Sequence, residues 1–327
     1  MTRTIIIIHP GALGDVLLAV PAMRRLKEQF PRRQLMLCAN GPVAQLLLEC
    51  RVIDAWISMQ GIVCASLFNR DAPVEGPLKS WLARCDCAVA WTQDEDGTLA
   101  ETLRNTGARS VIVSSPFSSG LKARHQSDRF CESLAGSPIR AKKHKPLQVS
   151  QQIQMHGRHI LQQAGIQTDQ ALVVIHPGSG SPRKSVGFST MASMIAEYQQ
   201  EGFTSMVIEG PADCDAVRRL MEETTAPKTV IRDLSLPVLA GVLSHAKMFV
   251  GHDSGVTHLA ALLGIPTIAI FGPTDPERWA PLGSHVTVIK SPLPQIHPTS
   301  LSSSASMGQG APVCLTDGKG FTTGYTC

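Results

Sequence analysis

Two stretches of this chain open in the same way. Residues 5–11 read IIIIHPG and residues 172–178 read LVVIHPG. A short apolar run that ends in a glycine-containing loop is typical of a buried strand. Segments with alternating helical and strand patterns follow both stretches, and such alternation predicts parallel sheets covered by helices. We therefore expect an α/β fold with two doubly wound, Rossmann-like domains that face each other across a cleft.

The patterns also indicate where the elements and domains begin and end. In the first half they predict helices over 16–29 and 43–50 and strands over 34–39, 55–59, 87–91 and 110–113. In the second half they predict helices over 151–164, 190–201, 213–223 and 236–245 and strands over 205–209, 248–251 and 267–271. We expect domains at 1–150 and 151–290, followed by an irregular or disordered tail at 291–327 that is rich in Ser, Thr, Pro and Gly.

Composition excludes several classes of protein. Hydrophobic residues make up 43% of the 327 residues and charged residues 17%, which is typical of a folded globular protein. No apolar run reaches the 18 or so residues that span a bilayer, and the run at 5–8 is too short for a signal peptide. The nine cysteines are scattered, which predicts reduced thiols in a cytoplasmic protein and no metal site.

Charge is distributed unevenly along the chain. Residues 1–150 carry 19 Lys and Arg against 13 Asp and Glu, whereas residues 151–327 carry 11 against 13. The basic residues are densest between Lys122 and Lys145. The positive charge of residues 1–150 favours an anionic partner or peripheral contact with an anionic membrane surface. A solvated basic loop would give the same pattern of charge. No nucleic-acid-binding motif is present, so nucleic acid is not an expected partner.

The most informative motif is GHDSGVTHLAALLGIPTIAIFGPTDP at 251–276. It predicts a strand end, a polar turn, a short helix and a second strand. Asp253 or Ser254 can cap the helix, and the backbone amides of Ser254, Gly255 and Val256 would form an anion site suited to phosphate. His258 lies about one turn after Ser254 and can face the same ligand. An ordinary helix–strand connection with a core histidine is the alternative.

This motif resembles the donor-binding signature of glycosyltransferase family 9, the ADP-heptose:lipopolysaccharide heptosyltransferases. That signature usually reads Asp-Thr-Gly-x-x-His, an apolar helix, Gly-x-Pro, a strand and Phe-Gly-Pro-Thr-x-Pro, and Ser254 replaces its threonine. The resemblance implies the two-domain GT-B fold and an inverting, metal-independent sugar transfer. The sequence also lacks a Gly-x-Gly-x-x-Gly motif after either opening strand, which argues against a dehydrogenase.

The loop GALGDV at 11–16 resembles the motif that opens this family. The resemblance implies that Asp15 is the general base, and Gly11 and Gly14 would allow a tight loop and close approach of the acceptor. Asp15 as a simple helix cap is the alternative. His9 stands where the family usually has a basic residue, and it is either partly cationic or a neutral residue at the strand end.

A second loop, HPGSGSPRKS at 176–185, combines glycines and serines with two cations. Lys184 matches by position the family lysine that contacts the donor diphosphate, and Arg183 can share that role. The usual Trp-Pro after this lysine is replaced by Val186 and Gly187, which leaves the local packing open. A solvated flexible loop is the alternative.

The resemblance implies that an acidic residue near the end of the next strand, at 205–209, binds the ribose hydroxyls of the donor. Glu209, Asp213 and Asp215 all qualify by position, and we favour Asp213, which is also the expected helix cap.

The resemblance implies an enzyme that moves a heptose or similar sugar from an ADP-sugar to the lipopolysaccharide core or another surface glycan. The resemblance implies that the first domain binds an anionic lipid-linked acceptor and that the second binds the nucleotide sugar, without a cofactor or metal. We expect a cytoplasmic protein in peripheral contact with the inner membrane. The alternatives are a non-catalytic protein that binds a nucleotide sugar or a partner, and a nucleotide-sugar 2-epimerase, which would need further carboxylates.

Overall fold

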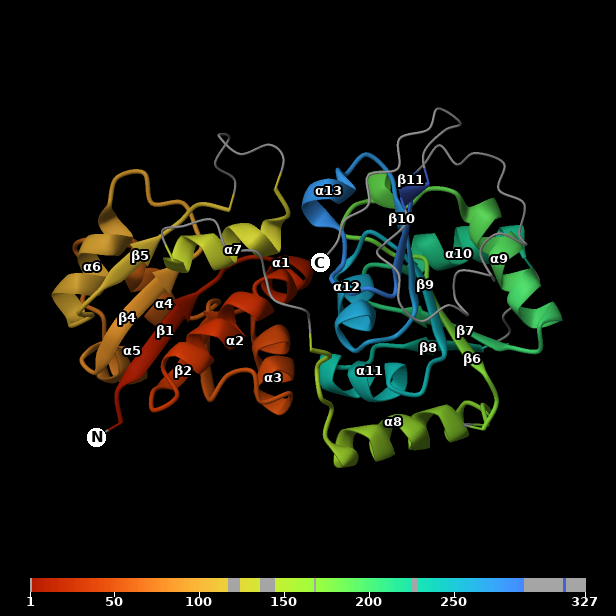
Figure 1. Ribbon diagram of the computed structural model, residues 1–327, viewed down its shortest axis with the longest axis horizontal. Coiled ribbons are helices and arrows are strands. Elements are labelled where there is room, and N and C mark those ends of the chain that lie inside the picture. Colours follow the sequence, from red (N-terminus) through yellow and green to blue (C-terminus); the bar gives the residue numbers. More distant parts are fainter. Residues whose placement is uncertain are drawn as a thin grey trace. The chain divides into compact units, whose positions relative to one another are not determined.

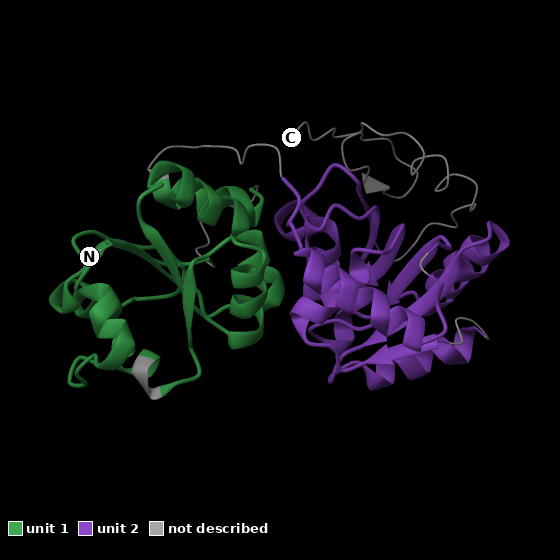
Figure 2. Cartoon of the chain, turned by 90° about the horizontal axis from the view of Figure 1, so that it is seen from below, with its two compact units in different colours: residues 1–142 green, residues 143–327 purple. Residues whose placement is uncertain are grey.

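The computed structural model describes residues 2–116, 124–135, 145–167, 169–224, 229–290 and 314–315. The chain divides into two compact units, Met1–Lys142 and Lys143–Cys327 (Figure 2). The division lies eight residues before the expected boundary at 150/151, so the stretch that leads into the first helix of the second half belongs to unit 2. No helix in the described ranges is long and apolar enough to cross a membrane.

Unit 1 contains a five-stranded parallel sheet in the order β3-β2-β1-β4-β5 (Figure 1). The strands are β1 (Thr4–Ile8), β2 (Gln34–Ala39), β3 (Ala55–Ser58), β4 (Cys85–Ala90) and β5 (Val111–Val113). β1 is central and all five of its residues are buried, because both faces of a doubly wound sheet are covered by helices. Its run of four isoleucines follows from that position.

The helices of unit 1 include several that the sequence patterns do not predict. They are α1 (Leu13–Leu18), α2 (Val20–Gln29), α3 (Gly41–Glu49), α4 (Ile62–Ala65), the 3₁₀ turn η1 (Ser66–Phe68), α5 (Gly76–Leu82), α6 (Thr98–Thr106) and α7 (Gln126–Ala135). The single helix expected over 16–29 is wrong, because the chain breaks at Ala19 and α2 restarts with Pro21 in its first turn. Ile6 and Ile8 pack on one face against α5, α6 and η1.

Unit 2 contains a seven-stranded sheet in the order β12-β11-β10-β9-β6-β7-β8, and all its pairings are parallel. The strands are β6 (Leu172–His176), β7 (Thr204–Glu209), β8 (Thr229–Arg232), β9 (Met248–His252), β10 (Thr267–Phe271), β11 (Val286–Lys290) and β12 (Cys314–Leu315). β8 and β11 lie outside the predicted segments. Of the expected tail at 291–327, only β12 is among the described residues, and it pairs with β11.

The helices of unit 2 cover both faces of its sheet. They are α8 (Gln151–Gln163), the 3₁₀ turn η2 (Pro182–Lys184), α9 (Phe188–Gln200), α10 (Cys214–Glu223), α11 (Leu236–Leu243), α12 (Gly255–Leu262) and α13 (Pro276–Trp279). The core on one face joins α9 and α10 to β6, β7 and β9. α8 crosses α11 where Gly157 meets Gly241, since a Cβ on Gly157 would lie 2.1 Å from the Gly241 carbonyl carbon.

These strand orders fix where each unit can carry a site. In unit 1 the chain leaves β1 in one direction and returns to β4 on its other side, and in unit 2 the same reversal separates β6 from β9. At such a switch point the loops at the carboxyl ends of the two strands diverge and leave room for a ligand. The prediction of two doubly wound α/β domains is therefore confirmed.

Candidate functional site

The switch point of unit 2 brings together the second loop and the motif at 251–276. Lys184, in η2 after β6, donates from Nζ to Oδ2 of Asp253, which directly follows β9, at 2.8 Å. The Lys184 side chain is 33% exposed and that of Asp253 only 6%. The Lys184 side chain thus stays partly exposed at the carboxyl edge of the sheet while it pairs with a buried carboxylate. The loop 177–186 is tied down there, so it is not merely a solvated flexible loop.

The amino end of α12 lies beside this ion pair. Ser254 is the N-cap, and its Oγ accepts a hydrogen bond from the Thr257 N–H at 3.3 Å. Gly255 and Val256 form the first turn and are half-buried. N–H groups of a first helical turn point outward along the axis and carry the positive end of the helix dipole, so this terminus is suited to bind a phosphate.

A buried hydrogen-bond network lies under this edge. His176, the last residue of β6, contacts Oδ2 of Asp213 through Nε2 at 3.0 Å and Oγ of Ser254 through Nδ1 at 3.2 Å. Asp213 also accepts the Gly210 N–H at 2.8 Å. Burial raises the pKa of the Asp213 carboxyl, but the hydrogen bond and charge of His176 and the Gly210 N–H outweigh it and hold the pKa below its ordinary value.

The three acidic candidates for ribose binding have different surroundings. Asp213 is 7% exposed and its carboxylate is engaged inside unit 2 by His176 and Gly210. Glu209 pairs with Arg232 at 2.9 Å, and Asp215 pairs with Arg218 at 3.3 Å. Asp213 therefore has a structural role as well, and ribose binding by it stays a prediction.

Two further predicted donor residues differ in accessibility. Arg183 is exposed next to Lys184 in η2. His258 lies in the second turn of α12 and is 5% exposed. Both remain candidates for contact with the donor.

Sequence reasoning missed one residue of this site, His252. It is fully buried at the end of β9, and its Nδ1 lies 2.7 Å from the Pro177 carbonyl oxygen while its Nε2 lies 3.2 Å from the Val186 N–H nitrogen. Burial lowers its pKa, although the carbonyls of Val186 and Pro177 act in the opposite direction. Its position directly before Asp253 was the one signal in the sequence, but its backbone partners are set by the fold.

In unit 1 the predicted base lies at the corresponding sheet edge. Asp15 is half-buried in the first turn of α1, and its Oδ2 accepts the Ala12 N–H at 3.2 Å. Gly11 lies close by, and a Cβ on it would be 2.9 Å from the Asp15 Cβ and 2.6 Å from Cε1 of His9. The helix-capping interaction is thus present, and the catalytic role of Asp15 stays a prediction. Gly14 lies in α1 next to Asp15.

His9 is a neutral residue at the strand end, so the partly cationic alternative is wrong. Burial lowers its pKa to about 4, despite smaller raising effects of backbone groups at Asp15 and His9. Its Nδ1 accepts the Gly11 N–H at 3.1 Å, and its ring lies edge-on to Phe130, with 5.3 Å between centroids. His9 therefore stabilises the loop that carries Asp15, through its hydrogen bond to Gly11, and does not supply positive charge.

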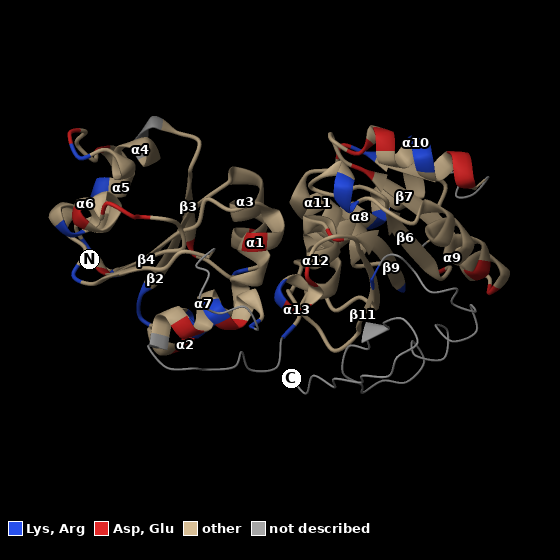
Figure 3. Ribbon diagram, turned by 90° about the horizontal axis from the view of Figure 1, so that it is seen from above, with Lys and Arg blue, Asp and Glu red and all other residues tan. Residues whose placement is uncertain are grey.

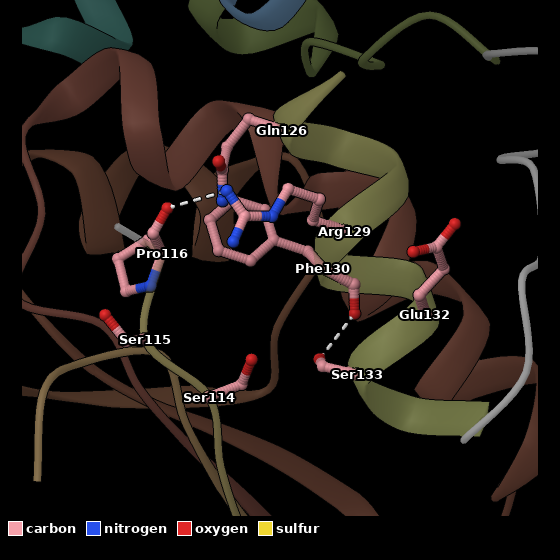
Figure 4. A pocket seen from close by; sticks show the side chains of 8 residues that line it. All are labelled: Ser114, Ser115, Pro116, Gln126, Arg129, Phe130, Glu132 and Ser133. Carbon is pink, nitrogen blue, oxygen red and sulfur yellow. Dashed lines mark hydrogen bonds between the residues drawn. The ribbon is translucent and has the colours of Figure 1, made fainter. Parts of the chain in front are cut away.

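A cavity of about 200 Å³ lies at the same edge of unit 1, between the end of β5 and α7. Figure 4 shows the Arg129 guanidinium donating to the Pro116 carbonyl oxygen, a bond of 3.2 Å, and the Ser133 hydroxyl donating to the Phe130 carbonyl oxygen. Its lining residues are Ser114, Ser115, Pro116, Gln126, Arg129, Phe130, Glu132 and Ser133. The sequence analysis did not single out this cavity, because β5 and α7 meet only in the fold.

Among the residues that the structure describes, no group of three or more His, Cys, Asp or Glu side chains is placed to hold a metal ion. The cysteines whose side chains are described are free thiols.

Comparison with known proteins supports the resemblance. The model of glycosyltransferase family 9 (heptosyltransferase) matches residues 122–305. Lipopolysaccharide heptosyltransferase 3 of Escherichia coli is 29% identical over 133 residues, 39% of this chain and 38% of that protein. Lipooligosaccharide heptosyltransferase 2 of Campylobacter jejuni is 22% identical over 84% of this chain and 83% of its own length. The match to the E. coli protein spans about two fifths of that protein's length.

Solved structures agree with the fold. A family 9 glycosyltransferase from Veillonella parvula superposes with a TM-score of 0.72 at 19% identity, over 88% of this chain and 86% of that one. The E. coli ADP-heptose lps heptosyltransferase II gives 0.68 at 17% identity, over 92% and 97%. These neighbours share the GT-B fold, which the sequence predicted. Because the family model spans more than half of its residues, the chain belongs to glycosyltransferase family 9.

Proposed function

We propose that the chain transfers a heptose or similar sugar from an ADP-sugar to the lipopolysaccharide core or another surface-glycan acceptor. The observation that carries this proposal is the meeting of Lys184 and the amino end of α12 at the switch point of unit 2. A cation beside free N–H groups is the arrangement that a diphosphate requires. The names of the relatives support the donor, since one E. coli heptosyltransferase was solved with ADP.

In the proposed reaction an acceptor hydroxyl attacks the anomeric carbon of the donor and the nucleoside diphosphate leaves from the opposite side. Asp15 takes the hydroxyl proton, and the new glycosidic bond forms with inversion because attack and departure occur on opposite sides of the anomeric carbon. Lys184 and the amides at 254–256 stabilise the negative charge that develops on the leaving diphosphate. This assignment gives the stabilising role to a side-chain cation and a helix terminus and needs no metal ion.

We place the acceptor in unit 1. That unit carries the excess of positive charge and a cavity at the carboxyl edge of its sheet with Arg129 in its wall. An anionic sugar suits both features, because a guanidinium group binds carboxylate or phosphate through two parallel hydrogen bonds.

The first test is calorimetric titration of the full chain with ADP, UDP and GDP. We expect selective binding of ADP, and Lys184→Ala should weaken it by about tenfold or more, since a charge-assisted hydrogen bond to phosphate is lost. Lys247→Ala is the matched control, because Lys247 is exposed on the same unit at the start of β9. Preference for UDP or GDP would exclude the ADP-sugar donor.

Turnover decides between an enzyme and a binding protein. Transfer from ADP-heptose to a lipopolysaccharide-core acceptor would support the proposal. Selective ADP binding without transfer to any acceptor would instead favour a non-catalytic nucleotide-sugar-binding protein.

A further inference from the structure

His252, the last residue of β9, and the two residues that follow it hold the loop 177–186, which carries Lys184. Ser254 contacts His176 at the loop's beginning, Asp253 pairs with Lys184 inside it, and His252 reaches both of its ends. Asp253 contacts Lys184, a side chain that the proposed mechanism uses, and Ser254 supplies a backbone amide to that mechanism. The contacts of His252 involve only the backbone of the loop, so its role is mechanical.

The His252 imidazole joins residues that are far apart along the loop. Nδ1 lies 2.7 Å from the carbonyl oxygen of Pro177, which directly follows β6. Nε2 faces both backbone groups of Val186, with the N–H nitrogen at 3.2 Å and the carbonyl oxygen at 2.6 Å. The ring therefore contacts the beginning of the loop through Nδ1 and its end through Nε2, and the tautomer decides which of the two nitrogens donates.

The imidazole is itself held rigidly. His252 is fully buried as the last residue of a central strand, and the Phe188 ring lies edge-on to it with centroids 5.5 Å apart. Val186 and Gly187 stand where a Trp-Pro pair was expected, and Gly187 starts α9 in the left-handed conformation with φ 66°. The end of the loop is thus fixed by His252 and the start of α9, although the bulky pair is absent.

We propose that His252 is a positioning residue for Lys184. Lys184 lies two residues before the end of the loop that His252 holds, so release of Val186 would let η2 move and carry the ammonium group away from the carboxyl edge. Preorganisation of this kind raises the affinity for the ligand. Because the loop is already ordered before the ligand binds, no binding free energy is spent on ordering it. The identity of the ligand, ADP, rests on the proposed function, whereas the constraint on the loop does not.

A double-mutant cycle on ADP affinity tests the proposal. We expect His252→Phe, which keeps an aromatic ring beside Phe188 but removes both backbone contacts, to weaken ADP binding about tenfold. In a Lys184→Ala background the same change should alter ADP affinity by less than about twofold, because it acts through Lys184. His245→Phe is the matched control, since it removes one histidine contact to a backbone carbonyl, Gln154 O at 2.9 Å, outside this loop.

Two conservative variants separate the two ends of the loop. The amide of His252→Asn reaches about where Nδ1 lies and can still bond Pro177, whereas that of His252→Gln reaches about where Nε2 lies and can still bond Val186. We expect the glutamine variant to retain more of the wild-type ADP affinity. If His252→Phe does not fold, the ADP affinities of the asparagine and glutamine variants still test the proposal.

Tryptic cleavage after Arg183 and Lys184 gives a readout that does not depend on the ligand. We expect His252→Phe to be cut there several times faster than wild type, with unchanged rates at Arg232 and with His245→Phe cut like wild type. If wild type does not bind ADP, the proposed function fails, and faster cleavage at this loop alone would still support the positioning role. Three results would overturn the positioning role of His252. They are unchanged cleavage at this loop in His252→Phe, equal ADP affinities of wild type and His252→Phe, and effects of His252→Phe and Lys184→Ala on ADP affinity that simply add.

Discussion

Asp15 combines a structural contact with a proposed chemical role, and one substitution separates them. The amide oxygen of Asp15→Asn can still accept the Ala12 N–H, so the start of α1 should persist and the urea midpoint should stay close to wild type. An amide cannot take a proton from the acceptor, so turnover at saturating substrates should fall at least about 100-fold. Sugar transfer and ADP affinity are measured on the same preparation.

The control for this change is Asp94→Asn. Asp94 also accepts backbone N–H groups at a helix start, those of Leu99 and Ala100 at 2.9 Å each. Its replacement should leave turnover within about twofold of wild type, as expected for a substitution away from the proposed chemistry. Native-like turnover in Asp15→Asn would remove Asp15 from the mechanism.

His9 should make the stability of unit 1 depend on pH. In the unfolded chain its imidazole binds a proton below about pH 6.5, whereas in the fold its pKa is about 4. Between these values the unfolded state binds more protons, so the free energy of unfolding falls as the pH is lowered, by at most about 3 kcal/mol. Urea unfolding at pH 7 and pH 4.5, followed by tryptophan fluorescence, measures this loss.

His9→Phe removes the titrating group and keeps an aromatic ring beside Trp91 and Phe130. Its stability should therefore depend less on pH than that of wild type across the same interval. His156→Phe, a change at an exposed position on α8, serves as the control. Equal slopes for wild type and His9→Phe would contradict the buried neutral state of His9.

At the scale of elements, the loop after β6 is packed against the turn between β7 and α10. A Cβ on Gly178 would lie 1.8 Å from Oδ1 of Asp213, whereas a Cβ on Gly180 would have nothing within 4 Å. Gly178→Ala must displace Asp213 from His176 and from the Gly210 N–H and leave buried polar groups unpaired. We expect it to lower the free energy of unfolding by about 2–3 kcal/mol, measured by urea denaturation.

Gly180→Ala is the matched control, since it is the same substitution two residues further along the same loop. It should change the free energy of unfolding by less than about 0.5 kcal/mol. Similar losses from both substitutions would mean that the loop, and not its contact with Asp213, determines the effect.

Local sequence patterns predict a strand correctly when an apolar run is bounded on both sides by residues typical of turns. β2 and β10 begin and end where the patterns place them, because each is a buried run next to polar or glycine-containing turns. β8 and β11 were missed because four- and five-residue strands with polar residues at their ends have little apolar periodicity. The break at Ala19 carried a signal that the helical pattern overrode: Pro21 would be the sixth residue of a helix over 16–29, where proline is unfavourable, but it fits the first turn of a helix that starts at Val20.

The site was predictable where function requires particular side chains. The meeting of Lys184 with the motif that begins at Asp253 follows from two loops at the carboxyl ends of neighbouring strands. The partners of His252 are backbone groups, which any sequence supplies, so only the fold shows its role. The cavity beside Arg129 likewise depends on how α7 packs, which no local pattern determines.

At the scale of the whole molecule, both units repeat one plan, a doubly wound sheet with its ligand edge at the switch point, but they differ in charge. In unit 2 acidic residues lie on α9, directly after it and on α10 (Figure 3), namely Glu197, Glu201, Asp215, Glu222 and Glu223. The basic residues of the first half are densest over 122–145, of which 136–144 lie outside the described residues. The first half therefore carries the sign of charge that favours an anionic partner.

We propose that this basic segment attaches the protein to the anionic, cytoplasmic face of the inner membrane, where a lipid-linked acceptor would be found. Each Lys or Arg near such a surface contributes about 1 kcal/mol, and the new carboxylates would be repelled, so the simultaneous change of Arg140, Lys142 and Lys143 to Glu should weaken binding at least about a hundredfold. Co-sedimentation with phosphatidylglycerol vesicles measures it. We expect binding to weaken at high salt, because salt screens exposed charges, and to be absent with phosphatidylcholine.

The same triple reversal in unit 2, at the exposed residues Arg158, Lys247 and Lys290, is the control for net charge. It changes the total charge by the same amount but leaves the segment 122–145 intact, so a local attachment site predicts near-normal vesicle binding. Equal losses from both triple variants would show that the overall charge of the protein, and not this segment, governs attachment. Salt-independent binding to both kinds of vesicle would exclude an electrostatic attachment and point to apolar insertion instead, since only the electrostatic part depends on anionic lipid and ionic strength.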